Sequence, residues 1–187
     1  VWDRCARRSP GELTLITLGP LTNLALALDR CPSVVRRFRS IIAMAGAIGC
    51  PGNVSAAAEF NVYVDPEAAQ RVLQAELPLT LIPLDVTERV AMSGAQIARE
   101  TRKSSDRVAR FLRDATGHAL AFARQVEGCD RFPFHDPLAV AAAVDPSLIR
   151  RVPLRVEVET RGRIARGATV ADRRPRRKAP TTPGLPP

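Results

Sequence analysis

The sequence lacks long apolar runs, and this absence argues against a membrane protein. A helix that spans a membrane needs about 18 residues with few charges. The longest candidate, residues 13–28, is interrupted by Gly19, Pro20 and Asn23. The amino-terminus also lacks the apolar core of a signal peptide, because charged residues such as Asp3 stand in its place. We therefore expect a cytoplasmic protein with no membrane contact.

Cysteines are few and scattered. No two of them form a Cys-x-x-Cys pair, so their spacing gives no support for a zinc site. The four cysteines are Cys5, Cys31, Cys50 and Cys129. In a cytoplasmic chain such residues are usually reduced and behave as small core side chains. We expect that role for all four.

Aromatic residues make up only 4% of the chain and are not interleaved with basic residues, as base-stacking surfaces require. The net charge is +9, but residues 150–178 hold eleven basic and three acidic residues, which leaves an excess of +1 for residues 1–149. The basic charge therefore belongs to one end of the chain, and we expect no dedicated nucleic-acid binding. The alternative is an interaction protein that binds nucleic acid in a salt-sensitive way through the residues after Asp172.

With 187 residues, 45% of them hydrophobic, the chain is long enough for one domain with its own core. The composition changes at Arg173, where a basic run begins, and five prolines stand in the last thirteen residues. We expect residues 1–172 to form a folded domain and residues 173–187 to form a basic, proline-rich disordered tail.

Short apolar runs alternate with helical patterns. Residues 13–18, 40–45 and 79–84 are typical of strands that are covered on both faces. This alternation predicts an α/β fold with a mostly parallel sheet flanked by helices. Ligands of such sheets bind at the carboxyl ends of the strands. Further predicted elements are helices over 66–74, 94–103, 105–125 and 136–144, and a strand-like alternation over 152–159.

The loop after the second predicted strand combines small residues with polar ones. Residues 44–61 are rich in glycine and alanine, so the backbone can approach a ligand closely. If this stretch is extended, Glu59 and Asn61 point to one side and Phe60 points to the core. A carboxylate and an amide on one side can bind the hydroxyls of a polyol. The alternative is a surface loop with a solvated carboxylate and a turn asparagine.

Two further stretches carry candidate ligands. His135 and Asp136 lie between apolar residues before a predicted helix, where the pKa values of charged groups shift. Asp136 is explained equally well as the N-cap of that helix, and His135 as a half-buried structural histidine. The backbone carbonyl of Leu18 follows the first predicted strand and can ligate a hard cation such as calcium. The alternative there is an ordinary strand-to-helix turn.

Taken in this order, the stretches resemble the inosine–uridine-type nucleoside hydrolase family. The resemblance covers roughly residues 11–172, and the Ala-Glu-Phe-Asn run at residues 58–61 belongs to its most specific part, together with the Asp-Pro-Glu-Ala-Ala run at residues 65–69. The matching segments are residues 18–25, 52–61, 64–69, 84–87 and 135–137.

The resemblance implies an enzyme that hydrolyses the N-glycosidic bond of ribonucleosides to ribose and free base, with one bound calcium ion. It also implies a homo-oligomer, a dimer or a tetramer. Asp136 and the backbone carbonyl of Leu18 would ligate the metal, and His135 would lie near the base and protonate it as it leaves. The implied sugar-binding residues are Met44, Asn53, Glu59, Asn61 and Asp136.

One signature of that family has no counterpart in this sequence. Nothing matches its Asp-x-Asp-x-x-x-Asp-Asp cluster on the first strand, and candidates such as Asp3 and Asp85 are isolated. We therefore expect a partial domain without the family's first strands, an incomplete calcium site and little or no catalysis. The alternative function is a non-catalytic, ribose- or nucleoside-binding remnant that keeps Asn53, Glu59 and Asn61.

Overall fold

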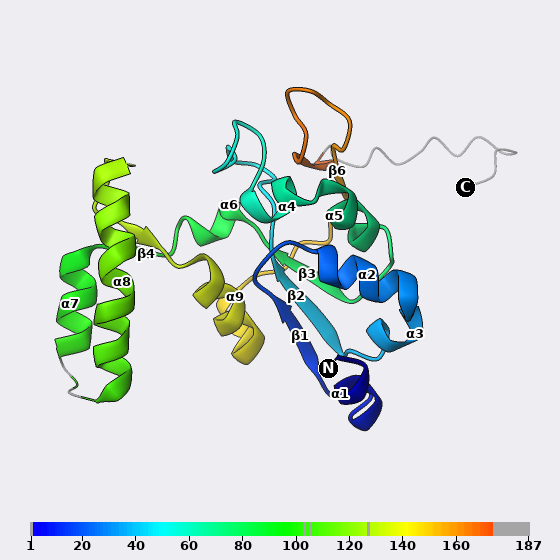
Figure 1. Cartoon of the computed structure of the whole chain (residues 1–187), viewed down its shortest axis with the longest axis horizontal. Coiled ribbons are helices and arrows are strands. Elements are labelled where there is room, and N and C mark those ends of the chain that lie inside the picture. The colour runs from blue at the N-terminus through cyan, green and yellow to red at the C-terminus, as the bar shows by residue number, and fades with distance from the viewer. Residues whose placement is uncertain (1, 103, 105, 127, 174–187) are drawn as a thin grey trace, which may run out of the picture.

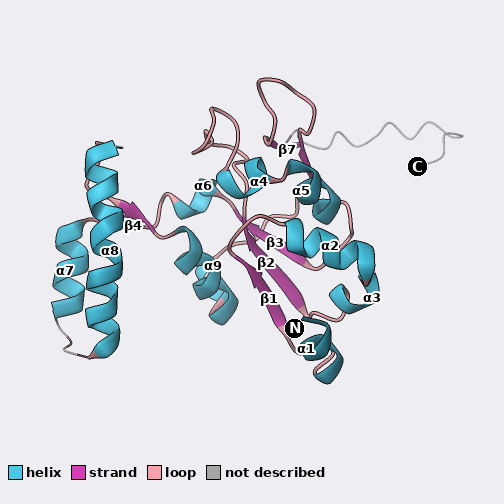
Figure 2. Ribbon diagram, viewed as in Figure 1, coloured by secondary structure: helices cyan, strands magenta, loops and turns pink. Residues whose placement is uncertain are grey.

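The centre of the molecule is a three-stranded parallel sheet with the order β1-β2-β3 (Figures 1 and 2). The structure is a computed structural model, and it describes residues 2–102, 104, 106–126 and 128–173. In the register of the sheet, Thr14 lies opposite Ser40, and Ile41 lies opposite Leu79. The predicted parallel sheet is confirmed. The strands are β1 (Thr14–Thr17), β2 (Ser40–Met44) and β3 (Leu79–Ile82).

One face of the sheet is covered by helices of the first half of the chain. Leu24 of one helix and Val72 of another are buried in the same apolar cluster as Ile41 of β2. The predicted start of the second of these helices is confirmed, because the Asp65 carboxylate accepts the N–H of Ala68 at 3.0 Å. The helices of this region are α1 (Trp2–Arg8), α2 (Thr22–Arg30), α3 (Pro32–Val35), α4 (Phe60–Val64) and α5 (Pro66–Leu73).

Helix α9 (His135–Val144) covers the other face. Its Ala139 is buried in a second apolar cluster with Met44 and Leu84. The helix is apolar nearly all round, and Val144 on its outer side is 81% exposed. The sheet therefore has helices on both faces, as the two-sided apolar strands predict.

A two-helix hairpin stands apart from the sheet (Figure 1). It consists of α7 (Gly94–Arg102) and α8 (Arg107–Val126). A short ribbon, β4 (Ala91–Met92) with β5 (Phe132–Pro133), joins it to the body. Residues 103 and 105, which the predicted helices include, lie outside the described residues. Within the described part of the chain, the helices are all too short or too polar to cross a membrane.

The remaining elements are α6 (Leu84–Thr87), the 3-10 helix η1 (Pro146–Leu148), β6 (Val156–Val158) and β7 (Thr169–Ala171). The predicted alternation over 152–159 is wrong for its first half. In the part of the chain that the structure describes, the strand begins at Val156 and pairs with β7, and Val152 lies outside it and is 56% exposed.

Three expectations about the surface and the tail need correction or stay open. The cysteines are free, but Cys5 and Cys31 are exposed rather than core residues, because each lies on the outer side of a helix or at its end.

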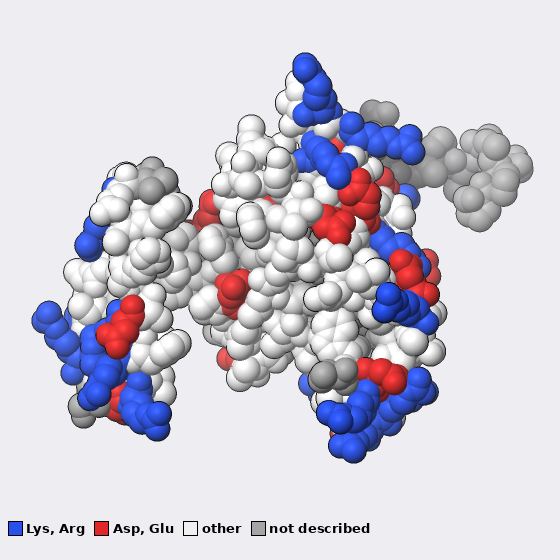
Figure 3. All heavy atoms as spheres, in the orientation of Figure 1, with Lys and Arg blue, Asp and Glu red and all other residues white. Residues whose placement is uncertain are grey.

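Basic side chains also gather at a second place, over α1 and the end of α3 (Figure 3). There, α1 contacts α3, and both segments carry exposed arginines, such as Arg4 and Arg36. The predicted tail lies outside the described residues except for Arg173.

Candidate functional site

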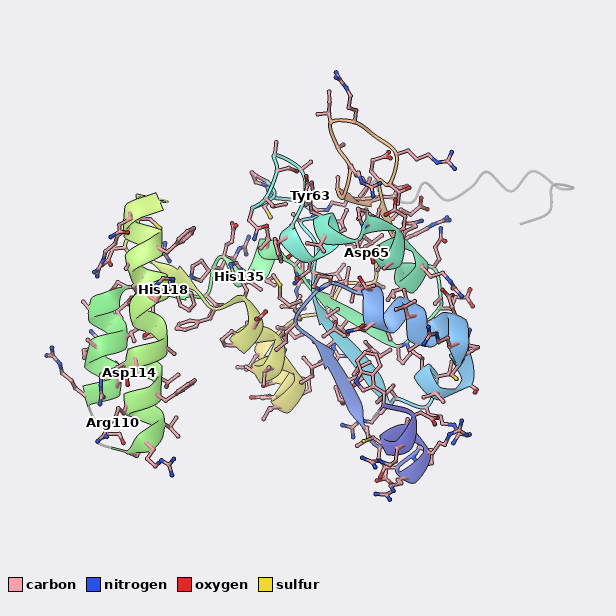
Figure 4. All side chains as sticks on the ribbon, in the orientation of Figure 1. Tyr63, Asp65, Arg110, Asp114, His118 and His135 are labelled. Carbon is pink, nitrogen blue, oxygen red and sulfur yellow. The ribbon has the colours of Figure 1, made fainter. Side chains whose placement is uncertain are left out.

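The carboxyl ends of β1, β2 and β3 meet at one edge of the sheet, because the strands are parallel. Leu18 follows β1, the loop of residues 45–59 follows β2, and α6 follows β3. Helix α9 begins at the same edge. Its first residue, His135, lies between α6 and the β4–β5 ribbon (Figure 4), and its Nδ1 is 2.7 Å from Oγ1 of Thr87. This edge therefore brings together the segments that carry the predicted site residues.

Glu59 is the most buried of the predicted site residues, at 1% exposure. Its carboxylate accepts three backbone N–H groups, from Asn61 at 2.8 Å, Gly46 at 2.9 Å and Val62 at 3.2 Å. The alternative of a solvated surface carboxylate is therefore wrong. The condition of an extended stretch holds only for Glu59, which has extended dihedrals as the N-cap of α4. Phe60 and Asn61 are helical, and Phe60 is 52% exposed instead of facing the core.

Asn61 links the start of α4 to the end of β2. Its Nδ2 donates to the carbonyl of Met44 at 3.0 Å and lies 3.4 Å from the Met44 sulfur. Both residues are buried, so the alternative of a turn asparagine at the surface is wrong. Glu59 and Asn61 both bind backbone groups at the end of β2, those of Gly46 and Met44, from the start of a helix and not from an extended stretch.

Asn53 closes the loop onto α4. It is exposed, and its Oδ1 accepts the N–H of Phe60 at 2.9 Å. The neighbouring Gly52 lies so close to the loop's own backbone that an added Cβ would collide with the carbonyl oxygen of Ala58. Gly52 is therefore required for the close packing of residues 52 and 58 of the loop against each other.

Asp85 of α6 holds the beginning of the same loop. Its carboxylate accepts the N–H of Ile48 at 2.8 Å and that of Gly49 at 2.6 Å, and Arg173 lies 3.4 Å away. Burial alone would raise the pKa of Asp85, but the two backbone N–H groups outweigh it and hold this pKa below its ordinary value. Burial and the charge of Asp85 raise the pKa of the Cys50 thiol to about 11, so this thiol stays protonated at neutral pH.

The lowered pKa of Asp85 makes a prediction for stability against pH. A carboxyl whose pKa is lower in the folded state stabilises the fold above its unfolded pKa, about 4 for aspartate, and loses this contribution as the pH falls through the folded value. We expect the difference in free energy of unfolding between wild type and Asp85→Asn to be constant above about pH 5 and to shrink below about pH 4. Urea unfolding from pH 7 to pH 3 measures it. A difference that grows toward acid contradicts the assigned hydrogen bonds.

His135 and Asp136 form the first turn of α9. The N-cap of this helix is Phe134, so the alternative that Asp136 caps it is wrong. The residue is exposed, yet neighbouring protein atoms desolvate its carboxyl and raise its pKa, an effect that the nearby His135 opposes. His135 is half-buried, and its ring is held by Thr87, whose side chain is fully buried.

The residues that could hold a metal are Leu18 and Asp136. A backbone carbonyl and a carboxylate are oxygen ligands of the kind that calcium prefers, although calcium takes about 6–8 of them. Among the described residues, no group of three or more His, Cys, Asp or Glu side chains could hold an ion. Thr17, which precedes Leu18, has a buried hydroxyl without a hydrogen-bond partner in the described part of the chain. The two ligands fit calcium in kind but not in number.

Two residues, Asp85 and Thr87, have contacts in the site that their place in the sequence does not indicate. In the sequence Asp85 is an isolated aspartate, and Thr87 is the last residue of the matching segment 84–87. The sequence signal for both is the short run Leu-Asp-Val-Thr, residues 84–87, which begins at the last residue of the third predicted strand.

The comparisons with known proteins agree with one another. Residues 1–183 match the family model described as inosine-uridine preferring nucleoside hydrolase. The chain is 38% identical over 170 residues to an uncharacterized protein of Schizosaccharomyces pombe, covering 91% of this chain and 54% of that protein. It is 37% identical to the pyrimidine-specific ribonucleoside hydrolase RihA of Citrobacter koseri, with 89% and 53% covered.

Solved structures give the same result. A plant nucleoside hydrolase superposes with a TM-score of 0.86 at 32% identity, covering 91% of this chain and 53% of that one. A purine-preferring ribonucleoside hydrolase from Gardnerella vaginalis gives 0.82 at 32% identity, with 91% and 54% covered. The chain thus spans about half the length of the relatives that it matches.

Proposed function

Because the chain belongs to the inosine-uridine preferring nucleoside hydrolase family, we propose that it carries the sugar-binding part of a site that hydrolyses ribonucleosides to ribose and free base. The observation that carries the proposal is the hydrogen-bonded set of Asn53, Glu59 and Asn61 at the carboxyl end of β2. These residues supply both donors and acceptors at one place, which the recognition of sugar hydroxyls requires.

The hydrogen-bonding capacity left over at these side chains fits that role. A carboxylate accepts about four hydrogen bonds, and the three backbone N–H groups at Glu59 leave about one. Asn53 uses its oxygen for Phe60, so its NH2 group is available as a donor. Asn61 uses an N–H for Met44, which leaves its oxygen. Asn53 is exposed and can contact a ligand directly, whereas Glu59 and Asn61 are buried beneath the loop.

We place the base near the start of α9. Thr87 occupies Nδ1 of His135, so Nε2 is the ring nitrogen that can protonate a departing base. General acid catalysis of this kind contributes about 10²–10⁴-fold to a rate. Ribose contacts that tighten as positive charge develops on the sugar favour the same bond cleavage. Met44, buried beside Asn61, would form the apolar floor of the sugar site.

Enzymes of this family depend on a metal ion, and we propose calcium. Leu18 and Asp136 would contribute a carbonyl and a carboxylate to its ligands, and Asp136 would also contact the ribose 2′- and 3′-hydroxyls. When bound, the ion lowers the pKa of a water molecule and so activates it for attack.

The proposed setting is a cytoplasmic homo-oligomer without membrane contact or dedicated nucleic-acid binding. The named relatives include pyrimidine-specific and purine-preferring enzymes, so the proposed substrate is a ribonucleoside of either class.

The test is the release of free base from inosine and uridine, with calcium and with a chelator. It compares the wild-type chain with a variant that carries His135→Ala and Asp136→Ala. Calcium-dependent release that the variant loses is the expected result for a hydrolase site. Binding of inosine without release would support the alternative, a nucleoside-binding remnant. If the wild-type chain neither binds inosine nor releases base, the proposed function is contradicted.

A further inference from the structure

Helix α6 is a single turn, but it contacts two separate parts of the proposed site. Asp85 binds the loop that follows β2, and Thr87 binds His135 at the start of α9. The two residues are two positions apart on one rigid turn, whose first residue, Leu84, is fully buried. A movement of one contact relative to the other would therefore require the turn itself to deform.

The contact with the loop consists of three backbone hydrogen bonds and the Cys50 thiol, whose sulfur lies 3.6 Å from Oδ2 of Asp85. Both oxygens of Asp85 accept backbone N–H groups, from Ile48 and Gly49, and the N–H of Leu84 donates to the carbonyl of Gly46 at 2.9 Å. Gly46 in turn donates its own N–H to Glu59. The position of α6 therefore determines the position of the first residues of the loop, and through Gly46 that of the proposed sugar-binding carboxylate of Glu59.

The contact with α9 is a single hydrogen bond between a fully buried hydroxyl and a ring nitrogen. Oγ1 of Thr87 lies 2.7 Å from Nδ1 of His135. A hydrogen bond at Nδ1 fixes the rotation of the ring and therefore the direction of Nε2. Apolar side chains of α6 and α9, among them Leu84 and Ala139, also pack in one cluster, but this hydrogen bond is the contact that acts on the ring itself.

We propose that Asp85 and Thr87 are positioning residues, which set the spacing and orientation of the sugar-binding loop and of His135 relative to each other. This inference rests on the proposed function, because the two contacts matter together only if one ligand spans both. Its consequence is that α6 sets the distance and direction from the ribose-binding residues to the base-binding residue, although neither Asp85 nor Thr87 contacts the ligand.

The experiment compares Asp85→Asn, Thr87→Val and Thr87→Ser with wild type, and Glu88→Gln, an exposed position next to α6, is the matched control. Amide hydrogen exchange measures how firmly the loop is held. The ring nitrogen signals of His135, recorded at one fixed pH, measure the orientation of its ring. Calorimetry with inosine measures binding. An asparagine cannot accept both N–H groups, so we expect Asp85→Asn to speed exchange at Ile48 and Gly49 about tenfold and to weaken inosine binding about tenfold.

Thr87→Val keeps the shape of the side chain and removes the hydroxyl. We expect it to change the ring nitrogen signals of His135 and to weaken inosine binding, whereas Thr87→Ser restores both and Glu88→Gln changes neither. Unchanged inosine affinity in Asp85→Asn and Thr87→Val would overturn the positioning role, even if exchange or ring signals change. A wild-type chain that binds no inosine overturns the proposed function instead, and unchanged exchange in Asp85→Asn shows that Asp85 does not hold the loop.

Discussion

Replacing Glu59 by alanine is expected to lower the free energy of unfolding by about 3–5 kcal/mol, because three buried N–H groups lose their acceptor and each unpaired group costs about 1–3 kcal/mol. The groups belong to Gly46, Asn61 and Val62, so the substitution frees both the beginning of the loop and the first turn of α4. A loss of this size is a large part of the stability of an ordinary domain, about 5–15 kcal/mol. Urea unfolding followed by circular dichroism measures it.

The control for this prediction is Glu12→Ala, which removes an exposed glutamate far from the loop along the chain. Substitutions at such surface positions change stability by about 0.5 kcal/mol or less. If Glu59→Ala unfolds with the same free energy as Glu12→Ala, then the Glu59 carboxylate does not hold the N–H groups that the structure assigns to it.

Replacing Asp136 by alanine is expected to have a large effect on binding and almost none on stability. Asp136 is exposed and does not cap α9, and its raised pKa shows that the folded protein disfavours its charge. We therefore expect the free energy of unfolding to stay within about 0.5 kcal/mol of wild type. Loss of a charged contact worth about 3 kcal/mol would weaken inosine binding in calcium about a hundredfold.

Calorimetric titration with inosine, in calcium and in chelator, measures this second prediction. The matched control is Asp114→Ala, which removes an aspartate on the outer hairpin, away from the sheet (Figure 4). We expect Asp114→Ala to bind like wild type and Asp136→Ala in calcium to bind no more tightly than wild type in chelator, because the variant loses both a metal ligand and the ribose contact. Equal affinities of Asp136→Ala and Asp114→Ala would remove Asp136 from the site.

The sheet could be predicted from the sequence because its strands are covered on both faces and therefore form continuous apolar runs. The three strands of the parallel sheet, β1, β2 and β3, lie inside the predicted ranges. The third one ends earlier than predicted, at Ile82, where Pro83 lacks the N–H that a strand ladder requires. The chain then turns directly into α6.

The conformation around Glu59 could not be predicted in the same way. Serine, threonine, aspartate and asparagine are the usual helix N-caps, and glutamate is not among them, so residues 59–61 do not carry the sequence signal of a helix start. The role of Asp85 was hidden for a different reason. Its partners, Ile48 and Gly49, are about 36 positions away, and a contact between two loops leaves no periodic pattern in the sequence.

The measurement that tests the central proposal most directly is the binding of inosine and 2′-deoxyinosine to the wild-type chain in calcium. If residues at the carboxyl end of the sheet recognise ribose hydroxyls, loss of one hydroxyl removes a hydrogen bond to a charged or polar group, and inosine should bind about tenfold more tightly or better. Equal affinities for the two nucleosides, or no binding of either, would contradict a sugar-binding site at this edge of the sheet.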